Sequence, residues 1–221
     1  VVSIDVGRRF PASGVLWSAD TIVTAEHSVK RDDDLKVTLP DGRAVNATLA
    51  GRDGGTDIAV LKIEPVAAPA RTVAPEESIR PGAFTIAVGR APEFGAHAAL
   101  GIISAVRGEW QTWRGGRLDR YIRLDLNLFP GLSGAAVVDT EGRLIGFATS
   151  GLSRIAAVAI PAATADRVVN EILTKGYVSR AYLGVGLQPV ALQGHEGAAL
   201  MVVSLEPNGP AATSGLLLGD I

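Results

Sequence analysis

Short segments in which apolar and polar residues alternate, separated by glycine-containing turns, run through most of the chain. The clearest alternation spans residues 121–128, where every second residue is apolar: Ile122, Leu124, Leu126 and Leu128. Period-two alternation is typical of a strand with one buried face. Asp41-Gly42 and Glu141-Gly142 each lie between two apolar segments, where a tight hairpin turn is expected. The pattern therefore predicts a mainly β protein of short strands and turns.

One segment has helical periodicity instead. Residues 162–175 follow Pro161, which suits the first turn of a helix, and precede Gly176, which suits its end. Its apolar stripe consists of Ala165, Val168, Val169, Ile172 and Leu173. A single helix after a run of strands indicates the end of one domain. We therefore predict two domains, at residues 1–177 and 178–221.

Composition and charge narrow the choice of partners. With 221 residues, 47% of them hydrophobic, the chain can bury one sizeable core and a small second module. Lys and Arg total 21 against 23 Asp and Glu, so no basic field is available to hold nucleic acid or anionic lipid. No apolar run approaches the ~18 residues of a membrane-spanning helix. The opening segment, residues 1–6, resembles a strand and lacks the features of an export signal.

Metal-binding patterns are also missing from the sequence. There is no cysteine, and the three histidines, His27, His97 and His195, lie far apart and outside any H-x-x-x-H spacing. We expect no metal site, and we interpret His97 and His195 as surface residues.

Three separated segments carry a nucleophile, a base and an orienting acid. His27 follows an apolar strand-like segment, Asp57 precedes another, and Ser133 lies in the glycine-rich sequence Phe129–Gly134. A hydroxyl is a weak nucleophile at neutral pH, so Ser133 needs a base such as His27, and Asp57 would hold the imidazole in the required tautomer. Taken singly, each residue also suits a structural role. Their order along the chain, His, Asp, Ser, is one of the known arrangements of a catalytic triad.

The glycines around Ser133 suit the same chemistry. Gly131 permits an unusual backbone turn, in which its own N–H and that of Ser133 point at a developing oxyanion. Each such donor contributes roughly 3–4 kcal/mol to transition-state stabilisation. We therefore predict an oxyanion hole formed by Gly131 and Ser133.

Several motifs together give the chain a family resemblance. The segments that carry it are residues 1–6, 22–29, 56–63, 87–92, 101–106 and 130–134. In sequence and order they resemble the HtrA/DegP-type serine proteases, a chymotrypsin-like family with C-terminal PDZ domains. The resemblance implies a double six-stranded β-barrel followed by a partial PDZ domain.

The same resemblance implies a function. It suggests a serine endopeptidase of bacterial envelope quality control that cleaves unfolded or extended polypeptides through an acyl-enzyme. It further implies a homotrimer in the periplasm or cell envelope, with no cofactor. We expect His27, Asp57 and Ser133 to form its triad.

The chain departs from the family pattern around the nucleophile. Leu132 stands where the family usually has Asn, and Ala135 and Ala136 replace Gly-Pro. Because a β-carbon at Ala135 crowds its neighbours, we expect residues 129–133 to be malformed or mobile without a ligand. The same departures leave a second hypothesis open, namely a catalytically silent, protease-like scaffold that binds or senses peptides.

Similarity to chymotrypsin-like enzymes also suggests a substrate pocket. Its base would be Asn127, six residues before the nucleophile, and its walls would include Thr149, Ser150 and Gly151. A neutral amide supplies no counter-charge for a basic side chain, so the resemblance implies a small or medium apolar P1 residue. Asn127 equally fits a solvated strand position, because it shares its predicted face with Arg123 and Asp125.

The last segment resembles a PDZ domain in two places. Tyr182, Leu183, Gly184 and Val185 are similar to the loop that receives a peptide's terminal carboxylate. Residues 209–216 and 219–221 are similar to the short PDZ helix and the strand after it. An intact domain of this kind would bind a C-terminal peptide. Because the chain ends about halfway through such a domain, we do not expect residues 178–221 alone to bind one.

Overall fold

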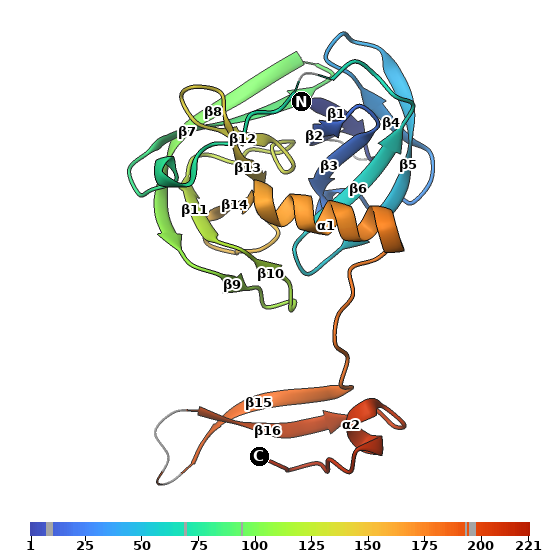
Figure 1. Ribbon diagram of the computed structural model, residues 1–221, viewed down its shortest axis with the longest axis vertical. Helices are drawn as coiled ribbons and strands as arrows, with labels where there is room; N and C mark the ends of the chain where they lie inside the picture. Colours follow the sequence, from blue (N-terminus) through green and yellow to red (C-terminus); the bar gives the residue numbers. More distant parts are fainter. Residues whose placement is uncertain (8–10, 69, 94, 193, 195–197) are drawn as a thin grey trace. The chain divides into compact units, whose positions relative to one another are not determined.

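The chain folds into two compact units. The computed structural model describes residues 1–7, 11–68, 70–93, 95–192, 194 and 198–221, so His195 lies outside the described residues. The first unit covers residues 1–178 and the second residues 179–221 (Figure 1).

The first barrel closes through six antiparallel strands in the order β1-β2-β3-β6-β5-β4. These are β1 (Val2–Asp5), β2 (Ala12–Ser18), β3 (Thr21–Ala25), β4 (Leu35–Thr38), β5 (Ala44–Asp53) and β6 (Ile58–Ile63). Gly42 lies in the predicted turn between β4 and β5 and has a φ of 89°. Pairing of β1 with β4 closes the barrel around an apolar core that includes Ile4, Ile22 and Leu61.

The second barrel also has six strands, in the order β11-β14-β13-β12-β7-β8. These are β7 (Phe84–Ala91), β8 (Gly95–Arg107), β11 (Tyr121–Asp125), β12 (Ala136–Val138), β13 (Leu144–Thr149) and β14 (Ala157–Pro161). Between β8 and β11 the chain forms a small ribbon of β9 (Trp110–Gln111) and β10 (Arg117–Leu118). The double six-stranded barrel is thus confirmed.

The alternating segment 121–128 is a strand only in its first part. Ile122 and Leu124 are buried and Arg123 and Asp125 exposed, as the pattern predicts, but β11 ends at Asp125. The chain leaves the ladder there because the next residues lead into a turn, closed by the hydrogen bond from Leu132 N–H to the Phe129 carbonyl.

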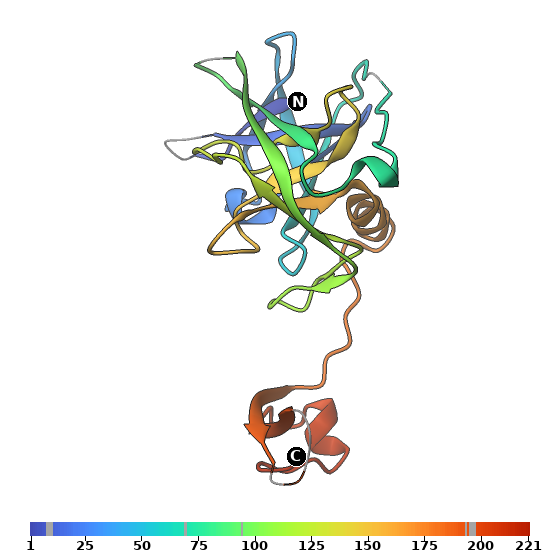
Figure 2. The same cartoon turned by 90° about the vertical axis from the view of Figure 1, so that its left-hand side faces the viewer.

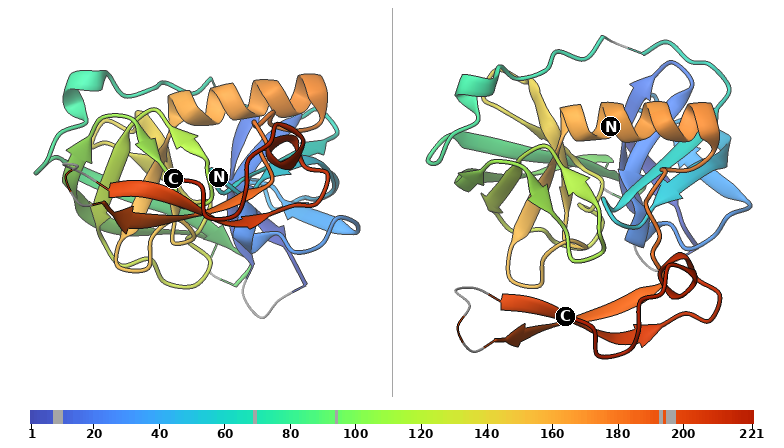
Figure 3. Two further views of the ribbon diagram at one scale, coloured as in Figure 1. Left: turned by 90° about the horizontal axis from the view of Figure 1, so that it is seen from below. Right: turned by 60° about the horizontal axis from the view of Figure 1, so that its bottom comes forward.

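Helix α1 (Ala162–Lys175) covers the junction of the two barrels, as Figure 3 shows, and Figure 2 presents the same helix nearly end-on. It ends at Gly176 in the left-handed conformation, so both predicted ends are confirmed. Four residues of the predicted stripe are buried, but Leu173 is 42% exposed, so its prediction was wrong. The buried stripe packs with Val23 and Val60 of the first barrel and Phe147 of the second in one shared core.

The second unit is a small β-hairpin with one helical turn. It contains β15 (Val185–Ala191), β16 (Ala198–Leu205) and α2 (Pro210–Thr213). Before β15, the carbonyls of Leu183 and Gly184 accept hydrogen bonds from the N–H groups of Ala211 and Glu206. The segment that resembles a carboxylate-binding loop is therefore tied to the chain after β16. Among the described helices, none is long and apolar enough to cross a membrane.

The hairpin between β12 and β13 is held by the nearly buried Asp139. Its carboxylate accepts hydrogen bonds from the N–H groups of Glu141 and Arg143, both at 2.9 Å, and from Arg143 Nε at 2.7 Å. Burial raises the pKa of Asp139, but the hydrogen bonds from Arg143 and Glu141 outweigh burial and hold the pKa below its usual value.

Replacing Asp139 with Asn is expected to destabilise the first unit at neutral pH. The free energy of unfolding should fall by roughly 1–2 kcal/mol, because hydrogen bonds to a charged group are lost. Since the folded pKa lies below the unfolded value of about 3.9, this difference is present above that value and vanishes as the pH falls through the folded pKa.

Urea unfolding followed by tryptophan fluorescence measures this effect, because Trp17, Trp110 and Trp113, the three tryptophans of the chain, all lie in the first unit. Glu141→Gln is the control, since that side chain is 66% exposed. Equal stability of Asp139→Asn and the unmodified protein at pH 7 would contradict the assignment.

Candidate active site

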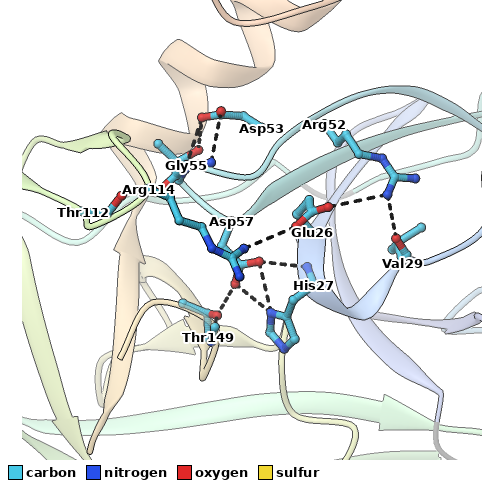
Figure 4. Close-up of polar contacts among 12 residues, drawn as sticks. Glu26, His27, Val29, Arg52, Asp53, Gly55, Asp57, Thr112, Arg114 and Thr149 are labelled. Atoms are coloured by element: carbon cyan, nitrogen blue, oxygen red, sulfur yellow. Dashed lines mark hydrogen bonds and ion pairs between the residues drawn. The ribbon is translucent and has the colours of Figure 1, made fainter. Parts of the chain in front are cut away.

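His27 lies just after β3, in a single 3₁₀ turn formed by Glu26–Ser28. This turn is bonded to the segment that carries Asp57: Glu26 N–H donates to the Asp57 carbonyl at 3.0 Å, and His27 N–H donates to Asp57 Oδ1 at 2.8 Å. Arg52 supports the same turn through its bond to the Val29 carbonyl and its ion pair with Glu26 (Figure 4). The backbone of His27 is therefore fixed independently of its ring.

Asp57 is fully buried, and its carboxylate is surrounded by donors. His27 Nδ1 lies 2.8 Å from Oδ2 and 3.1 Å from Oδ1, and the hydroxyl of Thr149 donates to Oδ2. Because a carboxylate accepts, Nδ1 carries the proton in this pair. The neutral imidazole then has its lone pair on Nε2, the tautomer that a general base requires.

A tight turn before β6 places Asp57 in this position. Asp57 has a φ of 58°, a left-handed conformation that costs a non-glycine residue roughly 1–2 kcal/mol. Asp53, only 6% exposed, stabilises the turn by accepting from the Thr56 hydroxyl at 2.6 Å and from the N–H groups of Gly55 and Thr56. The sequence analysis missed Asp53, although its spacing from Thr56 is typical of a side-chain-capped turn.

Ser133 lies in a closed turn at the entrance to β12. The bond from Leu132 N–H to the Phe129 carbonyl is 3.1 Å long, and Gly131 has a φ of 95°. Pro130 followed by a glycine with positive φ is the pattern of a type II turn. The N–H groups of Gly131 and Ser133 donate to no acceptor in the part of the chain that the structure describes. Two neighbouring amides are thus available to a ligand.

Two of the residues that depart from the family pattern lie beneath this turn. Leu132 and Ala135 are both fully buried and pack together with Ala99. The N–H of Ala135 also donates to the Leu132 carbonyl at 3.0 Å. The apolar residues at these positions therefore fill an apolar space under the turn.

Three consecutive residues at the end of β13 contact the three expected triad members. Thr149 donates to Asp57, the Ser150 hydroxyl lies 3.3 Å from Ser133 Oγ, and Gly151 adjoins the His27–Asp57 pair. No hydrogen bond joins Ser133 Oγ to His27 among the described residues. The segment 149–151 therefore brings the base of the first barrel and the hydroxyl of the second to one edge.

The four expected pocket residues lie in different environments. Ser150 lines a cavity of about 520 Å³ together with Leu126 and Leu128. Asn127 is exposed and lies beyond the end of β11. Thr149 is fully buried and does not form a pocket wall. Its hydroxyl instead donates to Asp57 and orients that carboxylate, a contact that the sequence analysis missed.

Charged residues also line this cavity, namely Arg123, Asp125 and Arg154. The lining therefore combines apolar side chains with charges of both signs. Elsewhere in the described residues, no three His, Asp or Glu side chains are grouped closely enough to hold a metal ion.

Comparison with known proteins gives consistent matches. Residues 12–147 match the family described as trypsin-like peptidase domain. A "Probable periplasmic serine endoprotease DegP-like" of Halomonas elongata is 34% identical over 97% of this chain and 47% of its own length. The "Serine endoprotease DegS" of Haemophilus influenzae is 33% identical over 95% of this chain and 63% of its own length. The chain thus spans less than two thirds of either relative.

Solved structures agree with these sequence matches. "HtrA-type protease AlgW with decapeptide" is 36% identical with a TM-score of 0.78, covering 94% of this chain and 67% of that one. The "serine endoprotease from Yersinia pestis" is 29% identical with a TM-score of 0.76, covering 99% of this chain and 75% of that one.

Gly151 is expected to be essential for the His27–Asp57 pair. A β-carbon there would lie 2.6 Å from both Asp57 Oδ2 and His27 Nδ1, so Gly151→Ala must displace one of them. The measurement is the downfield proton resonance of the carboxylate-bonded imidazole in protein labelled with ¹⁵N-histidine. Gly151→Ala should abolish or shift it strongly. Gly108→Ala, where a β-carbon meets nothing within 4 Å, should leave it unchanged. An unperturbed resonance in Gly151→Ala would contradict this geometry.

Proposed function

Because the chain belongs to the trypsin-like peptidase family, and within it to the HtrA-type serine endoproteases, we propose that it is a serine endopeptidase acting through His27, Asp57 and Ser133. The observation that carries this proposal is the His27–Asp57 pair, in which the fully buried Asp57 is oriented by Thr149. It lies at the same strand end that holds the hydroxyl of Ser133. The two amides without acceptors beside Ser133 give it further support.

In the first half-reaction, Ser133 Oγ exchanges its bond to Ser150 for one to His27 Nε2, through rotation of the Ser133 side chain. Oγ attacks the carbonyl carbon of the scissile peptide, and its proton passes to Nε2. Negative charge then develops on the carbonyl oxygen, where the N–H groups of Gly131 and Ser133 stabilise it.

Breakdown of this tetrahedral intermediate completes the first half-reaction. The tetrahedral intermediate collapses, the C–N bond breaks, and His27 protonates the leaving amine. This leaves an ester on Ser133. In the second half-reaction, water attacks that ester while His27 takes a proton from it. The new tetrahedral intermediate then collapses: the bond between the acyl carbon and Oγ breaks, His27 returns the proton to Oγ, and the carboxylic acid product leaves. Asp57 remains ionised throughout and stabilises the imidazolium.

The proposed substrates are unfolded or extended polypeptides. An extended chain presents its backbone for pairing with a strand edge, a common mode of peptide recognition. Leu126 and Leu128 line the cavity beside Ser150, which supports a small or medium apolar P1 residue. The cavity lining carries both positive and negative side chains, so it offers no dedicated negative charge to bind a basic P1 residue.

We further propose a place in envelope protein quality control, in the bacterial periplasm and as a homotrimer. Support for the compartment comes from the relatives described as periplasmic. Residues 179–221 would be the first part of a PDZ domain, with Tyr182–Val185 as its carboxylate loop. AlgW, an HtrA-type protease, has been solved together with a decapeptide, so AlgW itself accepts a peptide. In an intact domain, the loop would receive the C-terminus of such a ligand.

The competing hypothesis is a silent scaffold that binds peptides without cleaving them. It rests on the departures at Leu132, Ala135 and Ala136. The closed turn and the paired His27 and Asp57 favour the enzyme, because a silent scaffold has no need for either.

A fluorophosphonate probe tests the nucleophile directly. The unmodified chain should be labelled at Ser133 and should cleave casein, and Ser133→Ala should lose labelling, with kcat falling on the order of 10⁴-fold or more. Ser150→Ala is the matched control, because it removes the neighbouring hydroxyl and leaves the proposed nucleophile. It should still be labelled. Labelling at Ser150, or no labelling of the unmodified chain, would overturn the hypothesis of a serine endopeptidase in favour of the silent scaffold.

A further inference from the structure

Ser13 is a buried serine of β2 with no part in the proposed triad. Its side chain is fully buried, yet all of its polar groups are used. The hydroxyl donates to the Gly131 carbonyl at 2.6 Å and accepts from Arg90 N–H at 3.1 Å. Its N–H donates to the Ser133 carbonyl at 3.3 Å, and its carbonyl accepts from the Thr24 hydroxyl at 2.6 Å. A residue of the first barrel is thus bonded twice to the turn that carries Ser133 in the second.

The two bonds anchor alternate peptide groups of that turn. The peptide between Gly131 and Leu132 is held at its carbonyl by Ser13 and at its N–H by Phe129. The peptide after Ser133 is held at its carbonyl by Ser13 and at its N–H by the Ala148 carbonyl. The peptide between these two carries the N–H of Ser133, and the peptide just before the first carries the N–H of Gly131; neither N–H has an acceptor among the described residues.

This arrangement restricts how the free amides can turn. The Gly131 N–H changes direction when its peptide rotates about the bonds on either side, and this rotation changes φ of Gly131 from its value of 95°. The next peptide, between Gly131 and Leu132, is hydrogen-bonded at both its carbonyl and its N–H. It therefore cannot rotate to compensate for such a change in φ. The bond from the Ser13 hydroxyl to the Gly131 carbonyl is one of the two hydrogen bonds that fix this next peptide.

Two glycines are needed for Ser13 to approach so closely. A β-carbon at Gly134 would lie 2.0 Å from the Ser13 carbonyl oxygen, and one at Gly89 would lie 2.5 Å from the Ser13 hydroxyl. Gly134 follows the proposed nucleophile directly, and Gly89 belongs to β7. The space around Ser13 is thus kept free by glycines on two separate elements.

We propose that Ser13 is a positioning residue, whose hydroxyl orients the amide groups of Gly131 and Ser133 toward the developing oxyanion. The inference rests on the proposed function. Ser13 touches no substrate atom in this account and acts only through the carbonyl of Gly131. Its contribution belongs to the transition state, because only the developing oxyanion uses both amides fully.

Ser13→Ala tests the inference in the full chain. We expect kcat for a peptide substrate to fall about 10- to 100-fold, less than or similar to the roughly 10²–10³-fold cost of losing an oxyanion donor. KM should stay within about threefold, because ground-state binding does not depend on the oxyanion. Ser13→Cys, which keeps a weaker donor, should lie between Ser13→Ala and the unmodified chain.

Ser3 supplies the matched control. It faces Ser13 across the β1–β2 pair, is 1% exposed, and its hydroxyl has no hydrogen-bond partner among the described residues. Ser3→Ala therefore removes a buried hydroxyl from the same region without touching the turn. We expect its kcat to stay within about twofold.

Inhibitor binding separates positioning from general damage. A peptide boronate forms a tetrahedral adduct that uses the oxyanion hole, whereas the cleaved product peptide does not. In Ser13→Ala, boronate affinity should fall by about the same factor as kcat, and product affinity should be unchanged. Equal losses for both ligands, or a kcat within threefold of the unmodified chain, would overturn the role of Ser13. Absence of turnover and boronate binding in the unmodified chain would overturn the proposed function itself, and this inference with it.

Discussion

A buried carboxylate at the junction of two barrels governs the architecture of the site. Asp57 has no exposed surface, so its charge must be balanced by hydrogen-bond donors within the protein. The first barrel supplies the ring and backbone N–H of His27, and the second supplies the hydroxyl of Thr149. Removing any of them leaves part of a buried charge without a partner. Because donors from both barrels bind this carboxylate, the relative position of the barrels also determines how firmly Asp57 holds the proton on Nδ1 of His27.

The contacts of the second barrel follow from this coupling. The residues after Thr149 adjoin Ser133 and His27 in turn, so the strand that satisfies Asp57 also contacts the hydroxyl of Ser133, the proposed nucleophile. Ser13 makes the reverse connection, from the first barrel to the turn around Gly131. Each barrel thus holds a functional group of the other. The shared core under α1 keeps the barrels in contact, because it buries side chains from both.

Much of the fold could be predicted because it depends on local patterns. Period-two alternation, the turns at Gly42 and Gly142 and both ends of α1 are properties of short segments. The end of β11 was harder to predict, since Leu126 and Leu128 continue its alternation although the chain has already left the sheet. Leu173 likewise fits the helical stripe, but it lies beyond the face that the two barrels cover and stays exposed.

The candidate site could be predicted less completely, for a physical reason. Order along the chain identified His27, Asp57 and Ser133 as candidates, and the structure brings their segments to one strand end. The sequence carries no signal for contacts between distant segments, such as those of Thr149 with Asp57 and Ser13 with Gly131. Nor does it indicate that Leu132 and Ala135 pack together with Ala99 beneath the turn at residues 129–132.

A crystal structure of the chain with a peptide boronate bearing a small apolar P1 residue tests the central claim most directly. The account predicts boron bonded to Ser133 Oγ, with one boronate oxygen about 2.7–3.1 Å from the N–H groups of both Gly131 and Ser133. His27 Nε2 should lie on the opposite side of the boron, with Nδ1 still bonded to Asp57. Boron bonded to another residue, or a boronate oxygen that neither amide contacts, would contradict it.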